Sequence, residues 1–538
     1  MANRLFSQVP AGKPRRNVFD LSHDVKMSMD MGVLTPILCQ EVVPGDTWSC
    51  STEVMMRLAP MVAPMMHRCN IKTDFFFVPN RLVWDEWETF ITGGEEGTEQ
   101  PVFPHLHLDH FLGSNFVGSL ADYLGVPDAP SIQEPDQQWI STLPFRAYQL
   151  IYNEYYRDQN LTDPVEIYKG SGQEPEGQYL NLTPLRRRAW EKDYFTSALP
   201  WAQRGEPVLL PFGGISPVLV PEDGHSGGGR FRQSSNGTVP YGNDGSSNAL
   251  LGRVGQWSSS ARLGTTTSGS SESVYYDPNG SMSINVDESA SITINDLRRS
   301  IRLQEWLEKN ARGGGRYIEQ ILSHFGVRSS DSRLQRPEYL GGGKTPIKVS
   351  EVLQTSSSDD ITPQANMAGH GIAVGRTHRF RKFFEEHGLI IGLISVIPRT
   401  SYQQGLPRYF TKFDKMDFYW PEFANLGEQP VYNREIYVGS TQTYRDGTFG
   451  YQPRYAEYKY IPSSVHGEMR NTLDFWHMGR IFSPTEENYP PALNTEFVEC
   501  RPTERIWAVL DSEERLYCHI FHKIRAKRPM PKFGVPLL

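Results

Sequence analysis

Few residues of this 538-residue chain have the types and spacing that catalysis requires. The stretch LGGGKT, at positions 340–345, is similar to the end of a phosphate-binding loop. Such a loop needs an earlier glycine where this chain has Glu338, and Pro346 blocks the helix that must follow. We therefore expect an ordinary loop here and no nucleotide site.

The histidines of the stretch HLHLDH have a spacing that could hold a metal ion. His105 and His107 lie on one side of an extended segment, and His110 follows closely. Structural zinc sites use four protein ligands, and no fourth ligand is visible in the sequence. We expect solvated or hydrogen-bonded loop histidines, with neither a metal ion nor another cofactor.

The five cysteines form no CxxC pair and have no zinc-site spacing. Their odd number and wide separation indicate reduced, mostly buried thiols in a protein made in a cytoplasm. Serine, histidine and acidic residues are frequent, but none occurs in a nucleophile-elbow or cysteine–histidine signature. The sequence therefore predicts a protein that is not an enzyme and has no catalytic residues.

Both ends of the chain are basic, whereas the whole chain has a formal net charge of −8. Basic tails on an acidic body suit contact with a phosphate polymer, although solvated basic termini are also common. A third basic cluster, PLRRRAW at 184–190, is better explained by a helix face paired with Glu191 and Asp193 than by base stacking. The side chains expected to face DNA are Lys13, Arg15, Arg16, Lys523, Arg525, Lys527 and Arg528.

The stretch FGYQPRYAEYKYIPSSVHGEMR, at 449–470, is rich in tyrosine and arginine. Two prolines exclude a regular helix, and the tyrosines follow no strand period. Tyrosine and arginine are enriched at interface hot spots, because each buries a large area while its polar tip stays hydrogen-bonded. Together with PRYFTKFDKMDFYWPEF at 407–423, the stretch indicates extensive subunit contacts, with stacking on single-stranded nucleic acid as the alternative. The candidate interface residues are Arg454, Tyr455, Tyr458, Tyr460 and Arg470.

Strand patterns near both ends of the chain must position these groups. Strands that open and close a chain, with long connections between them, are typical of a Greek-key or jelly-roll barrel. No apolar run approaches the ~20 residues of a membrane helix, and no signal peptide is visible, so we expect no membrane insertion. Strands are predicted at 52–58, 71–78, 389–397, 505–510 and 515–524, and helices at about 80–91, 143–160, 295–312 and 316–325.

Composition divides the chain into four parts. Residues 205–291 are rich in Gly, Ser and Asn, which predicts an inserted surface protrusion in which Trp257, Tyr275 and Tyr276 form a small satellite structure. The other parts are a basic N-terminal arm, disordered or extended, at 1–30, the first part of the barrel at 31–204, and the remainder with long loops and a basic tail at 292–538.

Long stretches of the chain resemble the major capsid proteins of microviruses, in particular those of the gokushovirus branch. They include FDLSHD, VVPGDTW, DFFFVPNRLVWDEWETF and LPFRAYQLIYNEYYRDQNL. Further along are NDLRRSIRLQEWLEKNARGGGRYIEQILSHFGV and the tyrosine-rich stretch quoted above. Together the resembling stretches span most of the chain from about residue 17 to residue 478.

The resemblance implies a mainly β fold, an eight-stranded antiparallel jelly roll with long inserted loops and several short helices. Copies of the chain would close into a small T=1 icosahedral shell around circular single-stranded DNA. The insertion would form a protrusion at the three-fold axes, which makes Trp257, Tyr275 and Tyr276 candidates for host attachment. Implied partners are further copies of the chain, the DNA, a small basic DNA-packaging protein, other structural or scaffolding proteins and a bacterial surface receptor. The implied location is the virion, assembled in the host cytoplasm.

Two other classes stay open from the residues alone. A single-stranded-DNA-binding replication or packaging protein could read DNA with the basic helix NDLRRSIR, and it would stay small without DNA. An attachment spike would form a trimer and not a closed shell.

Overall fold

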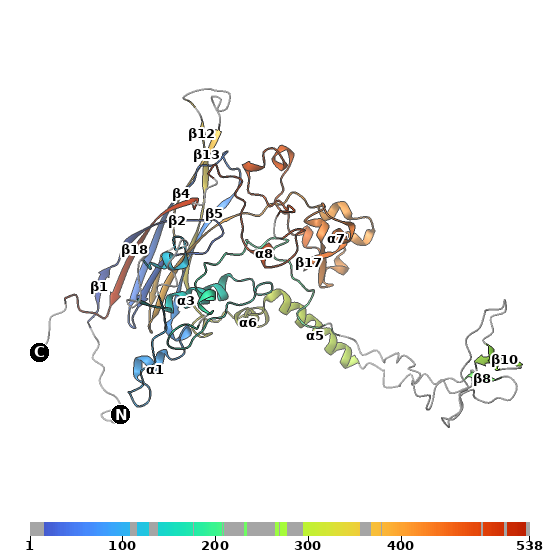
Figure 1. Cartoon of the computed structure of the whole chain (residues 1–538), viewed down its shortest axis with the longest axis horizontal. Coiled ribbons are helices and arrows are strands. Elements are labelled where there is room, and N and C mark those ends of the chain that lie inside the picture. Colours follow the sequence, from blue (N-terminus) through green and yellow to red (C-terminus); the bar gives the residue numbers. More distant parts are fainter. Residues whose placement is uncertain are drawn as a thin grey trace. The chain divides into compact units, whose positions relative to one another are not determined.

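The computed structural model of the chain divides into two compact units, Met1–Arg204 with Glu308–Leu538 and Gly205–Leu307, which are described separately (Figure 1). For residues 231–233, 264–267, 270–276 and 294 only the backbone is described. The structure describes residues 15–107, 116–127, 138–175, 177–206, 208, 231–233, 264–267, 270–276, 294–353, 355, 367–377, 379–485, 488–509 and 514–533.

Seven antiparallel strands form the larger sheet of the first unit, in the order β1-β18-β4-β13-β12, with β2 also paired to β18 and β14 to β4. β4 pairs with one edge of β18, and β1 and β2 share its other edge. Residues 17–29 of the predicted N-terminal arm are therefore part of this sheet. The strands are β1 (Asn17–Asp20), β2 (His23–Met29), β4 (Thr47–Leu58), β12 (Lys348–Leu353), β13 (Met367–Arg376), β14 (Phe380–Phe383) and β18 (Leu516–Arg528).

A second antiparallel sheet has four strands in the order β11-β5-β15-β3. The stretch LGGGKT, expected to be a loop, lies in β11, where a Cβ on Gly342 would approach the carbonyl oxygen of Thr73 on β5 to 2.3 Å. The glycines thus let two backbones approach closely and do not cradle a phosphate. The strands are β3 (Thr35–Val42), β5 (Cys69–Pro79), β11 (Glu338–Pro346) and β15 (Gly388–Pro398).

The four-stranded sheet separates two apolar cores. Phe75 and Phe77 of β5 pack with Trp48 and Ile520 from the seven-stranded sheet. Side chains on the other face of β5, such as Phe76, pack with helical and loop residues. Because this sheet is covered on both faces, β15 is buried along its whole length, which explains its continuous apolar sequence.

A third apolar cluster belongs to the long loops of the first unit. Phe195, Phe449, Phe482 and Phe497 are buried in it together with several tyrosines. Their rings contact one another, with Phe449 and Phe497 centred 5.0 Å apart. The loops are therefore packed structures with a core of their own.

Helices and short strand pairs occupy the connections. Helix α3 (Leu143–Ile151) packs its buried Tyr148 and Ile151 into the second core. The second unit contains a three-stranded sheet in the order β8-β10-β9. No helix among the described residues is long and apolar enough to cross a membrane. The other elements are α1 (Trp87–Thr92), α2 (Leu120–Leu124), α4 (Tyr179–Leu182), α5 (Ile294–Gly313), α6 (Tyr317–Phe325), α7 (Gln442–Asp446), α8 (Thr495–Val498), β6 (His105–His107), β7 (Trp139–Ser141), β8 (Phe231–Gln233), β9 (Gly264–Thr267), β10 (Ser270–Tyr276), β16 (Glu428–Tyr432) and β17 (Thr448–Pro453).

Most predicted elements are confirmed. Strands β4, β5, β15 and β18 correspond to four of the five predicted strand segments, and α5 and α6 correspond to two predicted helices. The helix predicted from about 80 to 91 is interrupted, with a 3-10 turn at Asn80–Leu82 and α1 beginning at Trp87. The helix predicted for 143–160 is shorter, because α3 passes into a π-helical turn at Tyr152–Tyr156.

The prediction of a strand at 505–510 is wrong. The described residues there form turns, with an isolated bridge between Trp507 and Met61. β18 pairs instead with β4 and β2, strands far away in the sequence. A local hairpin pattern cannot reveal such a distant pairing.

Candidate assembly and nucleic-acid surfaces

The seven-stranded sheet presents a row of basic side chains on its exposed face. Lys523, Arg525 and Lys527 of β18 are exposed, and they alternate with the fully buried Ile524 and Ala526. Strand geometry points successive side chains to opposite faces, so the core contacts of the apolar residues fix the direction of the basic ones. The three predicted DNA-facing residues of β18 therefore lie on one surface.

Neighbouring strands extend this surface with arginines that the sequence analysis missed. Ser49 of β4 lies between two arginines in the sheet register. It pairs with Arg525 of β18 on one side and with Arg381 of β14 on the other. Directly opposite residues of antiparallel strands share a face. The side chain of Arg379 also reaches this row, where its Nε donates to Ser49 Oγ at 2.6 Å.

The next row repeats the arrangement. Lys523 lies opposite Ser51, and Arg376 Nε donates to the Ser51 hydroxyl oxygen at 3.1 Å. Arg376 also contacts Glu53 at 3.5 Å, an exposed ion pair of little net energy. We define the basic face as the following residues: Arg376, Arg379, Arg381, Lys523, Arg525 and Lys527.

Arg528 does not belong to the basic face, which corrects its expected role. It ends β18 on the opposite side of the strand, where its Nε lies 3.2 Å from Oδ2 of the fully buried Asp46. Its guanidinium lies 5.3 Å from the centre of the Trp48 ring and donates to the carbonyl oxygen of Glu41 at 2.9 Å. The charge neutralises a buried carboxylate of its own chain and is therefore structural.

The N-terminal basic residues are only partly described. Arg15 and Arg16 are exposed, and Arg16 lies 5.3 Å from the ring centre of Phe383 on β14. Lys13 lies outside the described residues. Arg16 thus lies beside the same part of the sheet as Arg381.

The tyrosine-rich stretch is divided between the interior and the surface. Tyr455 is only 3% exposed, its φ is +62°, and its amide donates to Gln429 Oε1 at 3.1 Å. The prediction that a second chain buries Tyr455 is therefore wrong, because its own chain already does. The buried ring packs 4.9 Å from that of Tyr419, and its hydroxyl oxygen accepts from the amide of Trp420 at 3.3 Å.

The other candidate interface residues differ in exposure. Tyr458 is 53% exposed, with the ammonium of Lys412 3.9 Å from its ring centre. Arg470 is exposed, whereas Arg454 and Tyr460 are half-buried. Arg454 stacks 5.1 Å from the Tyr455 ring centre, and Tyr460 packs against the third core. The five residues do not form one surface, and Tyr458 is the exposed aromatic member.

The third basic cluster is neither a helix face nor a stacking site, which corrects the sequence-based interpretation. Arg188 donates to Ser395 Oγ at 3.0 Å and lies 5.2 Å from the Tyr156 ring centre. Arg186 donates to Gln149 Oε1 at 2.7 Å, and both arginines thereby tie irregular backbone to neighbouring elements. Glu191, expected to pair within the cluster, instead accepts from Lys344 on β11 at 2.6 Å.

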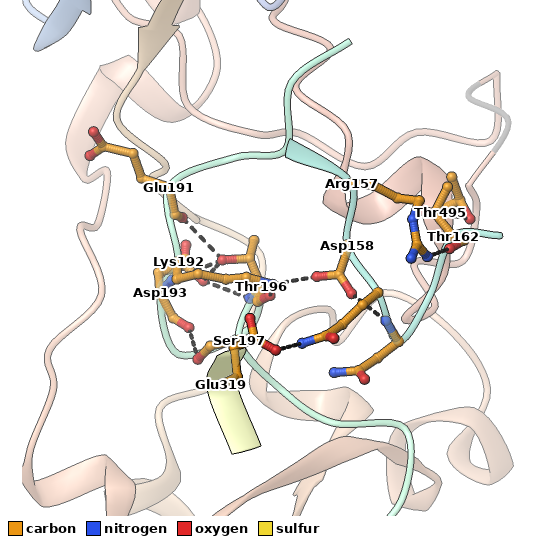
Figure 2. Close-up of polar contacts among 12 residues, drawn as sticks. Arg157, Asp158, Thr162, Glu191, Lys192, Asp193, Thr196, Ser197, Glu319 and Thr495 are labelled. Carbon is orange, nitrogen blue, oxygen red and sulfur yellow. Dashed lines mark hydrogen bonds and ion pairs between the residues drawn. The ribbon is translucent and has the colours of Figure 1, made fainter. Parts of the chain in front are cut away.

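The carboxylates after this cluster are occupied by structural hydrogen bonds. Figure 2 shows Asp193, Thr196 and Ser197 on one tight turn, with Lys192 reaching across to Asp158. The buried Asp193 accepts from the amides of residues 195 and 196 at 2.9 and 2.7 Å and from the Tyr402 hydroxyl at 2.8 Å. Such a carboxylate has no free lone pair with which to abstract a proton. The cluster holds loops together and provides no general base.

Within the described part of the chain, the cysteines and histidines likewise show no reactive arrangement. Burial raises the pKa of Cys50 to about 11 and that of Cys69 to about 12, so both stay as thiols. His105 and His107 stand against the ring of Trp139, and His110 lies outside the described residues. Within the described ranges no three metal-binding side chains come together.

The insertion is described only in part. Tyr275 and Tyr276 belong to β10, whose backbone pairs with β8 opposite Arg232 and Phe231. Trp257 lies outside the described residues. The backbone therefore places the two tyrosines at adjacent positions of a strand in a small sheet.

Comparison with known proteins identifies what kind of molecule carries these surfaces. The chain matches the family model described as "Capsid protein (F protein)" over residues 7–538. It is 38% identical to capsid protein VP1 of Chlamydia phage 1, over 100% of this chain and 98% of the relative. For capsid protein VP1 of Bdellovibrio phage phiMH2K the identity is 37%, over 99% and 97%, and for that of Spiroplasma virus 4 it is 31%, over 99% and 97%.

These matches extend over nearly the whole chain and nearly the whole of each relative, so they concern the complete architecture and not one shared motif. The chain belongs to the capsid protein (F protein) family of microviruses, as a structural protein of the virion and not an enzyme.

Proposed function

We propose that copies of this chain close into a small icosahedral shell around circular single-stranded DNA, with the basic face turned toward the DNA. The observation that carries this proposal is the arrangement of basic residues in two neighbouring rows across the larger sheet. In the first row Arg525 of β18, Ser49 of β4 and Arg381 of β14 lie side by side. In the second row Lys523 of β18 lies opposite Ser51 of β4. Each cation that neutralises a phosphate releases counterions and adds to affinity without reading sequence. A shell protein needs this kind of binding, because it must accept every part of a genome.

The strand orders support a jelly roll as the architecture of the subunit. Four strands of the larger sheet follow the order β2-β18-β4-β13, and the smaller sheet follows β3-β15-β5-β11. Chain order alternates between the two sheets in the way that two interleaved Greek keys require. In this scheme β1, β12 and β14 are additions to an eight-stranded barrel.

The insertion is proposed to attach the particle to its bacterial host. Its composition and its separation from the first unit as a compact unit of its own support a protruding element. Tyr275 and Tyr276 are the described candidates for receptor contact. Removing residues 209–291 should leave closed shells, visible in negative-stain images, that no longer adsorb to cells.

Assembly is proposed to involve a small basic DNA-packaging protein and scaffolding or other structural proteins. The support for these partners is the membership of the chain in the microvirus capsid protein family. Shells purified from cells that lack such partners should contain less DNA.

The first test is sedimentation and imaging of the purified chain with and without circular single-stranded DNA. Uniform closed shells support the proposal, whereas compact monomers that bind DNA in a salt-dependent way would contradict it. The second test replaces Lys523, Arg525 and Lys527 together by alanine. We expect shells with reduced packaged DNA and lower salt resistance, and unchanged DNA content would refute the assignment of the basic face.

A further inference from the structure

A dense group of apolar side chains is exposed on the loops that precede and contact the tyrosine-rich stretch. Phe413 is 91% exposed, and Tyr409 is 67% exposed. The rings of Tyr409 and Phe410 lie 4.4 Å apart, and that of Tyr419 lies 6.1 Å from that of Tyr458. We define the aromatic platform as the following residues, each more than 40% exposed: Tyr409, Phe410, Phe413, Met416, Phe418, Tyr419, Trp420 and Tyr458.

Specific hydrogen bonds hold the backbone of the platform in short turns. Oδ2 of Asp417 accepts from the amides of Phe413 and Asp414 at 3.0 and 2.9 Å, which closes the turn whose tip carries Phe413. Trp420 Nε1 donates to the carbonyl oxygen of Lys415 at 2.8 Å. A surface ordered in this way loses little conformational entropy when a partner covers it.

The cations beneath the platform are already neutralised. Arg408 lies 3.3 Å from Glu435, and Lys412 lies 3.5 Å from Glu457. A partner that covers the platform therefore does not have to bury these two charges unpaired, which is the main electrostatic cost of forming an interface.

The exposed area is large enough for a stable contact. At about 200 Å² for each fully exposed aromatic residue, the seven aromatic members expose on the order of 800 Å². Monomeric proteins seldom expose an apolar patch larger than about 300–600 Å². One side of a specific protein–protein interface buries about 800 Å². The platform residues thus expose about as much area as one side of a specific interface buries.

We infer that the aromatic platform is buried by a second copy of this chain in the assembled particle. The inference rests on the proposed function and names one of its interfaces. Stacking on DNA is the weaker reading, because the segment 407–423 carries Asp414, Asp417 and Glu422 beside its three cations, two of which are paired. Unlike the basic face, this surface has no excess of positive charge to follow a phosphate backbone.

The test replaces Tyr409 and Phe413 by serine in the full chain, with Tyr317→Ser and Phe325→Ser on α6 as the matched control. The control pair is the same in residue type and is 71% and 79% exposed. We expect the platform variant to lose at least tenfold of its shell fraction in sedimentation while its thermal unfolding stays unchanged. We expect the control variant to assemble within twofold of the parent chain.

Other outcomes separate the possible failures. Parental assembly of the platform variant would overturn the inference, as would an equal loss in the control. A variant that assembles normally but binds an oligo-dT strand more weakly would identify the platform as a base-stacking surface instead. If the parent chain forms no shells even in cells that also produce its proposed assembly partners, the proposed function itself fails.

Thiol labelling gives a second readout. Four of the five native cysteines are buried and Cys39 is partly buried, and burial raises the pKa of all five thiols, so a Phe413→Cys thiol would be the most reactive group. We expect it to be labelled at least tenfold more slowly in shells than in dissociated subunits. Equal rates in the two states would overturn the inference.

Discussion

The basic face and the aromatic platform present their side chains by different physical means. On the basic face each exposed residue of β18 alternates with a core residue, so the whole sheet fixes its direction. On the platform the turns depend on single groups such as Asp417 and the buried Tyr455. We therefore expect the basic face to lose function gradually, one charge at a time, and the platform to fail when one anchor is removed.

The largest effect should come from removing the buried anchor of the platform. Tyr455→Ala empties a site that is 3% exposed, and we expect unfolding free energy to fall by about 3–5 kcal/mol in chemical denaturation. Tyr458→Ala is the matched control, since this tyrosine is 53% exposed and should cost about 1 kcal/mol or less. Equal losses in the two variants would show that the platform has no single anchor.

A charge at the end of β18 should behave unlike its neighbours on the basic face. Arg528→Ala leaves the carboxylate of Asp46 buried without its cation, and we expect a loss of about 3 kcal/mol in stability. The salt dependence of DNA binding should not change, because Arg528 is turned away from the basic face. A reduced salt dependence at unchanged stability would place Arg528 back among the DNA contacts.

Low pH should destabilise the larger sheet by protonating a buried histidine. His522 of β18 is fully buried, and its two ring nitrogens contact the hydroxyl of Thr52 at 2.8 Å and the carbonyl oxygen of Ile37 at 2.9 Å. The carbonyl can only accept, so Nε2 donates to it and the neutral ring accepts from Thr52. Burial lowers the pKa of His522 to about 4, because the charged ring would lose its hydration.

The sign of the pH effect follows from this shift. The unfolded chain binds the proton near pH 6.5 and the folded chain only near pH 4, so stability is complete above about pH 6.5 and falls as the pH drops toward 4. The expected total is on the order of 3 kcal/mol. His522→Gln should flatten the stability profile in this range. Identical profiles for the parent chain and H522Q would contradict the assignment.

The smallest effect on stability should come from three exposed arginines, one in β13, one in β14 and one just before β14. Replacing Arg376, Arg379 and Arg381 by alanine removes exposed charges, so unfolding free energy should change by less than about 1 kcal/mol. The slope of log affinity for single-stranded DNA against log salt should fall by about 2, at roughly 0.7 for each lost contact. An unchanged slope would restrict the basic face to β18.

The sequence predicted the regular elements better than their pairing. Alternation identified β4, β5 and β18, and a continuous apolar run identified β15, because burial on one or both faces leaves those patterns in a strand. The family resemblance, confirmed by the full-length matches, identified the kind of protein. Local patterns could not show that β14 lies beside β4, so Arg379 and Arg381 were missed as partners of Arg525.

The sequence also could not predict which side chains of the irregular loops are buried and which are exposed. Tyr455 and Tyr458 have the same residue type three positions apart, yet one is a core residue and the other is exposed. Their difference depends on a left-handed backbone at Tyr455 and on Tyr419 and Trp420, which lie some 35 residues earlier. Composition indicates that such a segment contains both buried anchor residues and exposed contact residues. It does not indicate which tyrosine has which role.

The central place of β18 has a consequence for the timing of folding. This strand is synthesised after every other described strand, yet β1, β2 and β4 all pair with it. Until it leaves the ribosome, the larger sheet lacks its middle, and contacts this distant in sequence form late and slowly. A nascent chain therefore cannot complete the basic face. If the basic face binds DNA as proposed, this binding should reach its full strength only after translation has passed β18, and a chain truncated before β18 lacks the strand to which β1, β2 and β4 pair.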